Sequence, residues 1–117
     1  MNAEPLADAR AFGLRVCTSD LGGCAPVRLV AEYDRAARTI RISAAAVAAV
    51  RREHGDAAAD ALTAAAVAHE LYHHAVAEGR LRAASGAAEA EERADRYARE
   101  RYGIDQARFE RLLRRCW

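Results

Sequence analysis

The sequence contains few cysteines, and their number is odd. Cys17, Cys24 and Cys116 are its three cysteines, whereas a secreted domain stabilised by disulfides usually carries an even number. The six residues between Cys17 and Cys24 also exceed the about two to four that separate paired ligands in structural zinc sites. We therefore expect reduced structural thiols, and neither a disulfide framework nor a zinc ion held by cysteines.

An excess of charge of one sign is also missing. The formal net charge is +1 at pH 7, which gives no electrostatic reason to expect nucleic acid or a membrane surface as a partner. The last four arginines could contact nucleic acid, but the near-neutral charge favours the solvated side of an amphipathic closing helix. These residues are Arg108, Arg111, Arg114 and Arg115.

The sequence has no long uninterrupted apolar run. The alanine-rich stretch 57–77 carries Asp60, Glu70 and three histidines, so it is not expected to cross a membrane. The first residues show neither the basic region nor the apolar segment of a signal peptide. We therefore expect a cytoplasmic protein.

The length and the residue patterns of the sequence predict one small α+β domain over residues 1–117. This length supports a single hydrophobic core. Alternation of period two over 27–34 and 39–43, with a polar link between them, predicts a β-hairpin. Capping residues and glycines mark the ends of the helices. The predicted order is a helix at 6–12, a strand at 14–17, the two hairpin strands, and helices at 44–53, 56–78, 86–102 and from 105 onward.

One motif on the longest predicted helix points to chemistry. His69-Glu70-Leu71-Tyr72-His73 matches the pattern HExxH. Residues four apart lie one turn above each other on a helix, so His69 and His73 can share one metal ion. Glu70 lies about 100° around the helix from His69, where it can act as general base on metal-activated water. The motif therefore predicts a catalytic zinc site; the alternative is a set of exposed polar residues on an alanine-rich helix.

The third metal ligand must come from another segment. In metzincins a glycine and a histidine follow in the pattern HExxHxxGxxH, but Val76 and Gly79 stand at those positions. Glu78 lies five residues after His73 on the same helix and faces away from it. The next predicted helix is therefore the expected source.

Helix geometry favours one carboxylate on that helix. Its acidic residues are Glu89, Glu91, Glu92 and Asp95. If 79–86 is the turn of an αα-hairpin, His73 and Glu91 lie about 9 Å and about 7.5 Å from the turn, at a rise of about 1.5 Å per residue. Two packed helices about 8–10 Å apart allow inward side chains to share a metal. Glu91 is therefore the predicted ligand, Glu89 is a weaker alternative, and Glu92 is expected to face solvent.

These motifs resemble a known group of enzymes. HELYH followed by Glu-Glu-Arg-Ala-Asp-Arg-Tyr-Ala at 91–98 is similar to the HExxH…ExxA(D/N) pattern of gluzincin metallopeptidases, and most similar to the ImmA/IrrE family and the minigluzincins. The likeness covers the two motif helices closely, and the preceding strand pair and helix in general order. The resemblance implies that His69, His73 and Glu91 bind zinc and that Glu70 is the base. It also implies that Asp95 supports a ligating histidine, as the free N–H of such an imidazole usually requires.

The resemblance also implies a fold and a function. The fold would be a small zincin-like domain in which the β-hairpin packs on the active-site helix and a ligand-bearing helix follows. The activity would be that of a zinc metalloendopeptidase acting on a protein or peptide, and a helix-turn-helix repressor is a candidate substrate or partner. Two alternatives stay open: a non-catalytic zinc-binding regulatory module, and a pseudo-peptidase whose zinc serves stability.

The sequence also suggests roles for several side chains near the motif and for one strand. Tyr97, Tyr102 and His74 are unranked candidates for stabilising an oxyanion. His74 is expected to be a solvated neighbour of His73, and Tyr72 to cover the rear face of the helix. The outer strand of the hairpin, either 39–43 or 27–34, is expected to bind substrate as an added strand.

Overall fold

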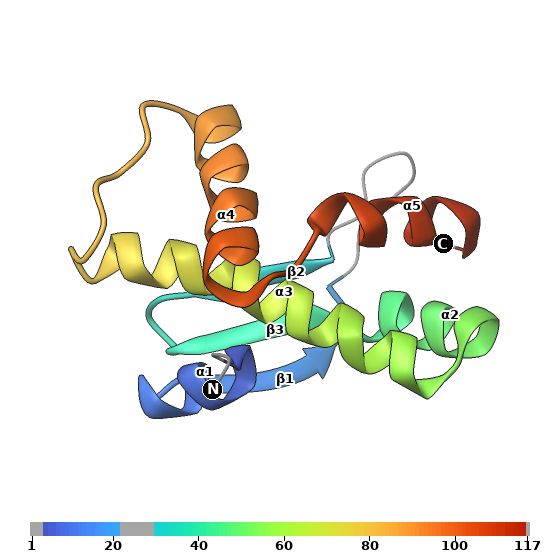
Figure 1. The fold of residues 1–117 in the computed structure, drawn as a ribbon. Helices are drawn as coiled ribbons and strands as arrows, with labels where there is room; N and C mark the ends of the chain where they lie inside the picture. The colour runs from blue at the N-terminus through green and yellow to red at the C-terminus, as the bar shows by residue number, and fades with distance from the viewer. Residues whose placement is uncertain (1–3, 22–29, 117) are drawn as a thin grey trace.

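The protein is described by a computed structural model, which covers residues 4–21 and 30–116 (Figure 1). In these ranges the elements are α1 (Pro5–Ala11), β1 (Arg15–Ser19), β2 (Ala31–Asp34), β3 (Thr39–Ser43), α2 (Ala44–His54), α3 (Asp56–Ala77), α4 (Ala87–Tyr102) and α5 (Gln106–Cys116). The α+β class and the predicted order of elements are confirmed. Cys24 and the first residues of the predicted hairpin strand lie outside the described residues.

The three strands form one mixed sheet in the order β1-β3-β2. β2 runs antiparallel to β3, with Tyr33 opposite Ile40, so the predicted hairpin is confirmed. Its turn is closed by Asp34, whose Oδ1 accepts the backbone N–H of Ala37 at 3.0 Å. β1 pairs with the other edge of β3 in the parallel sense. The expectation that 39–43 could be an outer, substrate-binding strand is therefore wrong, because both of its edges are already paired.

The core lies between this sheet and the long helix α3. Ile40 and Ile42 of β3 are fully buried, and they cluster with Leu62, Val67 and Leu71 of α3. The two strand residues are two apart, and Val67 and Leu71 are four apart in the helix, so each pair lies on one face of its element. The hairpin therefore packs on the motif helix, as predicted.

Short signals in the chain set the ends of the helices around α3. The Ser43 Oγ accepts the backbone N–H of Ala46 at 3.2 Å, so α2 begins directly after β3. Gly55, with φ of +91°, separates α2 from α3 in a backbone region that favours glycine. A left-handed Gly103 ends α4 and leads into α5. No described helix is both long enough and apolar enough to cross a membrane.

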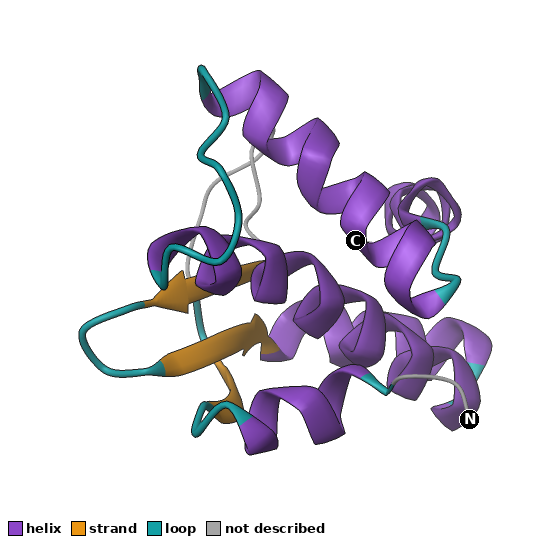
Figure 2. Cartoon of the chain, turned by 60° about the vertical axis from the view of Figure 1, so that its left-hand side comes forward, coloured by secondary structure: helices purple, strands orange, loops and turns teal. Residues whose placement is uncertain are grey.

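α3 occupies the centre of the described structure. It contacts β2, β3, α1, α2, α4 and α5. Figures 1 and 2 show α4 on the side of α3 away from β1, and in Figure 1 its axis crosses that of α3. This central position presents α3 to the edge strand β2 and to α4 and α5, which supply the remaining walls of the site described next.

Candidate metal centre

The contact between α3 and α4 depends on two alanines. Ala94 and Ala98 of α4 are fully buried. Because side chains at a helix contact set the distance between the axes, small residues here bring the α4 backbone close to α3. Glu91 and Asp95 lie three residues before these alanines and therefore on a neighbouring part of the same face. The alanines thus position two carboxylates beside the histidines of α3.

The predicted ligands converge at this contact. The His69 Nε2 lies 2.6 Å from the Glu91 Oε2, and the His73 Nε2 lies 3.5 Å from the Glu91 Oε1. One ligand atom from each of the three residues lies within 4.8 Å of the others. The structure therefore brings together two imidazoles and one carboxylate that could hold a metal ion.

The neighbouring acidic residues are engaged elsewhere or exposed. The Glu89 carboxylate accepts the backbone N–H of Ser85 at 3.1 Å and also contacts the Ser85 hydroxyl and the Arg93 guanidinium. Glu92 is exposed, as expected. Of the four acids considered on this helix, Glu91 is therefore the one that the geometry joins to both histidines.

The donor set fits zinc. Ligands at about 2.0–2.1 Å in a tetrahedral arrangement lie about 3.3 Å apart, and the two observed separations of 2.6 Å and 3.5 Å straddle that value. The imidazole side chains are 17% and 26% exposed and the Glu91 side chain is 61% exposed. The two imidazoles are therefore partly buried, whereas the Glu91 side chain is accessible to solvent.

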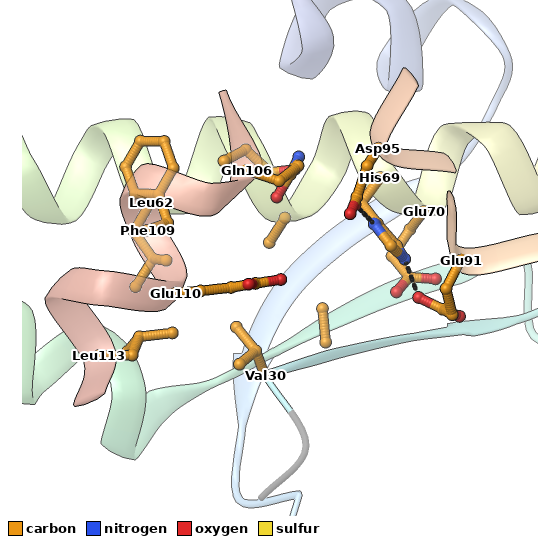
Figure 3. A pocket seen from close by; sticks show the side chains of 13 residues that line it. Val30, Leu62, His69, Glu70, Glu91, Asp95, Gln106, Phe109, Glu110 and Leu113 are labelled. Atoms are coloured by element: carbon orange, nitrogen blue, oxygen red, sulfur yellow. Dashed lines mark hydrogen bonds and ion pairs between the residues drawn. The ribbon is translucent and has the colours of Figure 1, made fainter. Parts of the chain in front are cut away.

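Asp95 orients one of the two imidazoles. The His69 Nδ1 lies 3.0 Å from the Asp95 Oδ1 (Figure 3). Since a carboxylate only accepts, the Nδ1 carries the proton of this bond, and the Nε2 on the opposite side of the ring faces Glu91. The structure thus places Asp95 where a supporting residue is needed.

Glu70 lies beside the three ligands but is much less exposed. Its exposure is 7%. Burial raises the pKa of its carboxyl to about 7; the charge of Glu91 adds to this effect, and His69 opposes it. A pKa close to the working pH suits a group that must take up and release a proton.

The second histidine is partly buried. Its burial lowers the pKa of His73, and the charge of His69 adds to this effect. Neutral imidazole is the form that binds metals, because binding requires a free nitrogen lone pair.

The centre forms one end of a pocket of about 490 Å³. Its walls come from α3, α4, α5 and the start of β2, and Figure 3 shows the metal-binding end and the α5 end together. The lining residues are Val30, Ala31, Leu62, Ala65, Ala66, His69, Glu70, Glu91, Asp95, Gln106, Phe109, Glu110 and Leu113. A substrate bound here would contact the ligands, the edge strand and α5.

The structure corrects the expectation for His74. It is 2% exposed, not solvated. The Tyr33 hydroxyl and the His74 Nδ1 form a hydrogen bond of 2.8 Å, and the Phe12 ring packs nearby. β2 covers this side of α3, which the position of His74 in the sequence alone does not reveal. Burial lowers the pKa of His74.

None of the three oxyanion candidates lines the pocket. His74 lies in the core, and the Tyr102 hydroxyl donates to the Asp8 Oδ2 at 2.6 Å. Tyr97 packs between Tyr72 and Tyr102. Tyr72 is 4% exposed, and its hydroxyl has no hydrogen-bond partner within the described part of the chain.

Sequence analysis did not identify the contribution of α5 to the pocket. Gln106 and Glu110 both line it. Gln106 is anchored there, because its Nε2 donates to the backbone oxygen of Ala65 at 2.9 Å. The amphipathic pattern of 105–116 predicts a helix, but it does not indicate against which part of α3 that helix packs.

Comparison with known proteins gives no relative. No family model matches the chain, and no curated protein or solved structure is similar enough to count as a match. The functional argument therefore depends on the residues and geometry described above.

Proposed function

We propose that the protein is a zinc-dependent metallopeptidase of the gluzincin type, built on a small zincin-like domain. One observation carries the proposal: ligand atoms of His69, His73 and Glu91 lie within 4.8 Å of one another. Glu70 lines the same pocket. This combination joins a zinc donor set from α3 and α4 to a buried proton acceptor on α3.

Each residue has a specific task in peptide-bond hydrolysis. His69, His73 and Glu91 would hold zinc, which supplies Lewis acidity toward a carbonyl and lowers the pKa of water when it is bound. Glu70 takes the proton of the attacking water and delivers it to the leaving amine. Asp95 keeps the His69 ring in one tautomer and one orientation throughout.

The edge strand β2 gives the substrate a place to bind. Among the strands of the described residues β2 pairs with β3 alone, and Ala31 at its start lines the pocket. An extended peptide that pairs with this edge would gain main-chain hydrogen bonds without a sequence requirement. We therefore propose a protein or peptide substrate, with a cytoplasmic helix-turn-helix repressor as the candidate that the family resemblance supplies.

Metal analysis combined with a cleavage assay tests this function. The purified protein should contain about one zinc per chain, and His69→Ala and Glu91→Ala should lose it. The zinc-loaded protein should cleave a denatured casein, whereas Glu70→Gln should retain zinc and lose cleavage by at least about 100-fold. Glu92→Gln, an exposed neighbour of Glu91, should change neither.

The outcomes separate the alternatives. Absence of zinc, or zinc that survives both ligand substitutions, contradicts the metal centre itself. Zinc binding without cleavage, together with retained binding of a repressor, would favour the non-catalytic regulatory module. Zinc binding with a large loss of thermal stability on chelation, but neither cleavage nor partner binding, would favour the pseudo-peptidase.

A further inference from the structure

The pocket extends well beyond the metal ligands. Its far end is apolar, with Leu62 of α3, Phe109 and Leu113 of α5, and Val30 beside β2 (Figure 3). Leu62 is 2% exposed and Phe109 is 7% exposed, so these walls are held firmly by the core. A concave apolar surface of this kind favours an aliphatic or aromatic side chain of a ligand.

The charged groups that line the pocket are nearly all acidic. Four are carboxylates, from Glu70, Glu91, Asp95 and Glu110, and His69 is the one basic side chain among the lining residues of the described chain. The chain has 18 Arg and Lys residues, yet none of them lines the pocket in the part that the structure describes. Bound zinc would offset the negative charge at its own end of the pocket, so the carboxylate that can attract a cation is the one away from the metal ligands, Glu110.

Glu110 is the acid that the hydrolytic mechanism does not use. Figure 3 shows its side chain reaching from α5 into the pocket, between the apolar end and the metal-binding end. Arg114 lies one turn further along α5, but its Nε donates to the backbone oxygen of Glu110 at 3.5 Å and not to the carboxylate. Glu110 is exposed and lines the pocket, so a ligand bound there can pair with its carboxylate.

We propose that α5 forms a specificity subsite that selects peptides in which an apolar side chain adjoins a positively charged group. The apolar side chain packs on Phe109 and Leu113, and the cation pairs with Glu110. This inference rests on the proposed peptidase function and deepens it. The cation is an ammonium or guanidinium group, from a lysine or arginine side chain or from a free peptide amino terminus.

A set of short fluorescence-quenched peptides tests the subsite. The peptides carry Leu-Arg, Leu-Gln or Leu-Glu at the centre, each with a free or an acetylated amino terminus. Values of kcat/KM are measured on the zinc-loaded protein. Affinities are measured by fluorescence anisotropy on zinc-loaded Glu70→Gln, which binds without cleaving.

The subsite predicts a preference of about tenfold for the cationic over the acidic peptides, as expected for a charge pair in a partly desolvated site. Glu110→Gln should reduce this preference to about twofold or less, and Glu110→Lys should reverse it. The matched control Glu100→Gln, an exposed acid of α4 outside the pocket, should retain it. A preference for arginine in acetylated peptides assigns the cation to a side chain; a preference abolished by acetylation assigns it to the amino terminus.

Failure of the subsite and failure of the hydrolase give different results. Cleavage that does not depend on peptide charge, or a preference unchanged in Glu110→Gln, overturns the subsite and leaves the hydrolase intact. Charge-selective binding that Glu110→Gln abolishes, without any cleavage, supports the subsite and overturns the hydrolase. Equal melting temperatures of Glu110→Gln and the wild type exclude misfolding as the cause of a lost preference.

Discussion

Replacement of Glu70 by glutamine should stabilise the metal-free protein at neutral and alkaline pH. Glu70 is 7% exposed, and burial raises its pKa from the ordinary 4.5 to about 7. The folded state therefore holds a carboxylate in a place that disfavours its charge. Glutamine has nearly the same shape without the charge, so the substitution removes this cost.

The magnitude follows from the two pKa values. The difference between about 7 and 4.5, at about 1.4 kcal/mol per pH unit, corresponds to about 3.5 kcal/mol. For a domain of this length that is a rise in Tm of about 14 °C. This exceeds the effect of most surface substitutions, which lie within about 0.5 kcal/mol.

The stability difference between Glu70→Gln and the wild type should depend on pH. Because the folded pKa lies above the unfolded one, the contribution of Glu70 to wild-type stability is fully present below about pH 4.5, where Glu70 is protonated in both states. This contribution is lost as the pH rises from there through the folded pKa of about 7. Glu70→Gln should therefore match the wild type at pH 4 and exceed it at pH 8.

Thermal and urea denaturation in the presence of a chelator measure this difference. The matched control is Glu92→Gln, in which the same chemical change occurs at an exposed position. It should follow the wild type at every pH. A Glu70→Gln protein that is no more stable than the wild type at pH 8, or equally stabilised at pH 4 and pH 8, would refute the argument from burial.

Three further substitutions test the supporting contacts. Asp95→Asn should weaken zinc binding by about 10–100-fold, as measured by competition with a chromogenic chelator, because the His69 Nδ1 loses its carboxylate; unchanged affinity would contradict the orienting role. Ala94→Leu should lower the free energy of unfolding by about 1–3 kcal/mol and weaken zinc binding, since added volume at a fully buried contact moves α4 away from α3. Tyr33→Phe should destabilise by about 1–2 kcal/mol in urea denaturation, because the buried His74 loses its hydrogen bond.

The sequence alone predicted the elements of this fold well, because their signals are local. Glycines and a serine cap set the ends of α2 and α3, and alternation of period two marks β3. The sheet order was not predictable in this way. The parallel pairing of β1 with β3 joins strands far apart in the chain, and no local pattern records which edge of a strand is occupied.

Part of the candidate site was also predictable from local sequence signals, and part was not. The four-residue spacing of His69 and His73 in one helix determined that both rings face one point, and the rise per residue made Glu91 the matching acid. Only the tertiary structure decided what surrounds them. β2 buries His74, and the packing of α5 against α2 and α3 brings Glu110 into the pocket. The spacing of side chains along a helix is set by a few neighbouring residues, whereas the position of one element against another depends on side chains contributed by the whole chain.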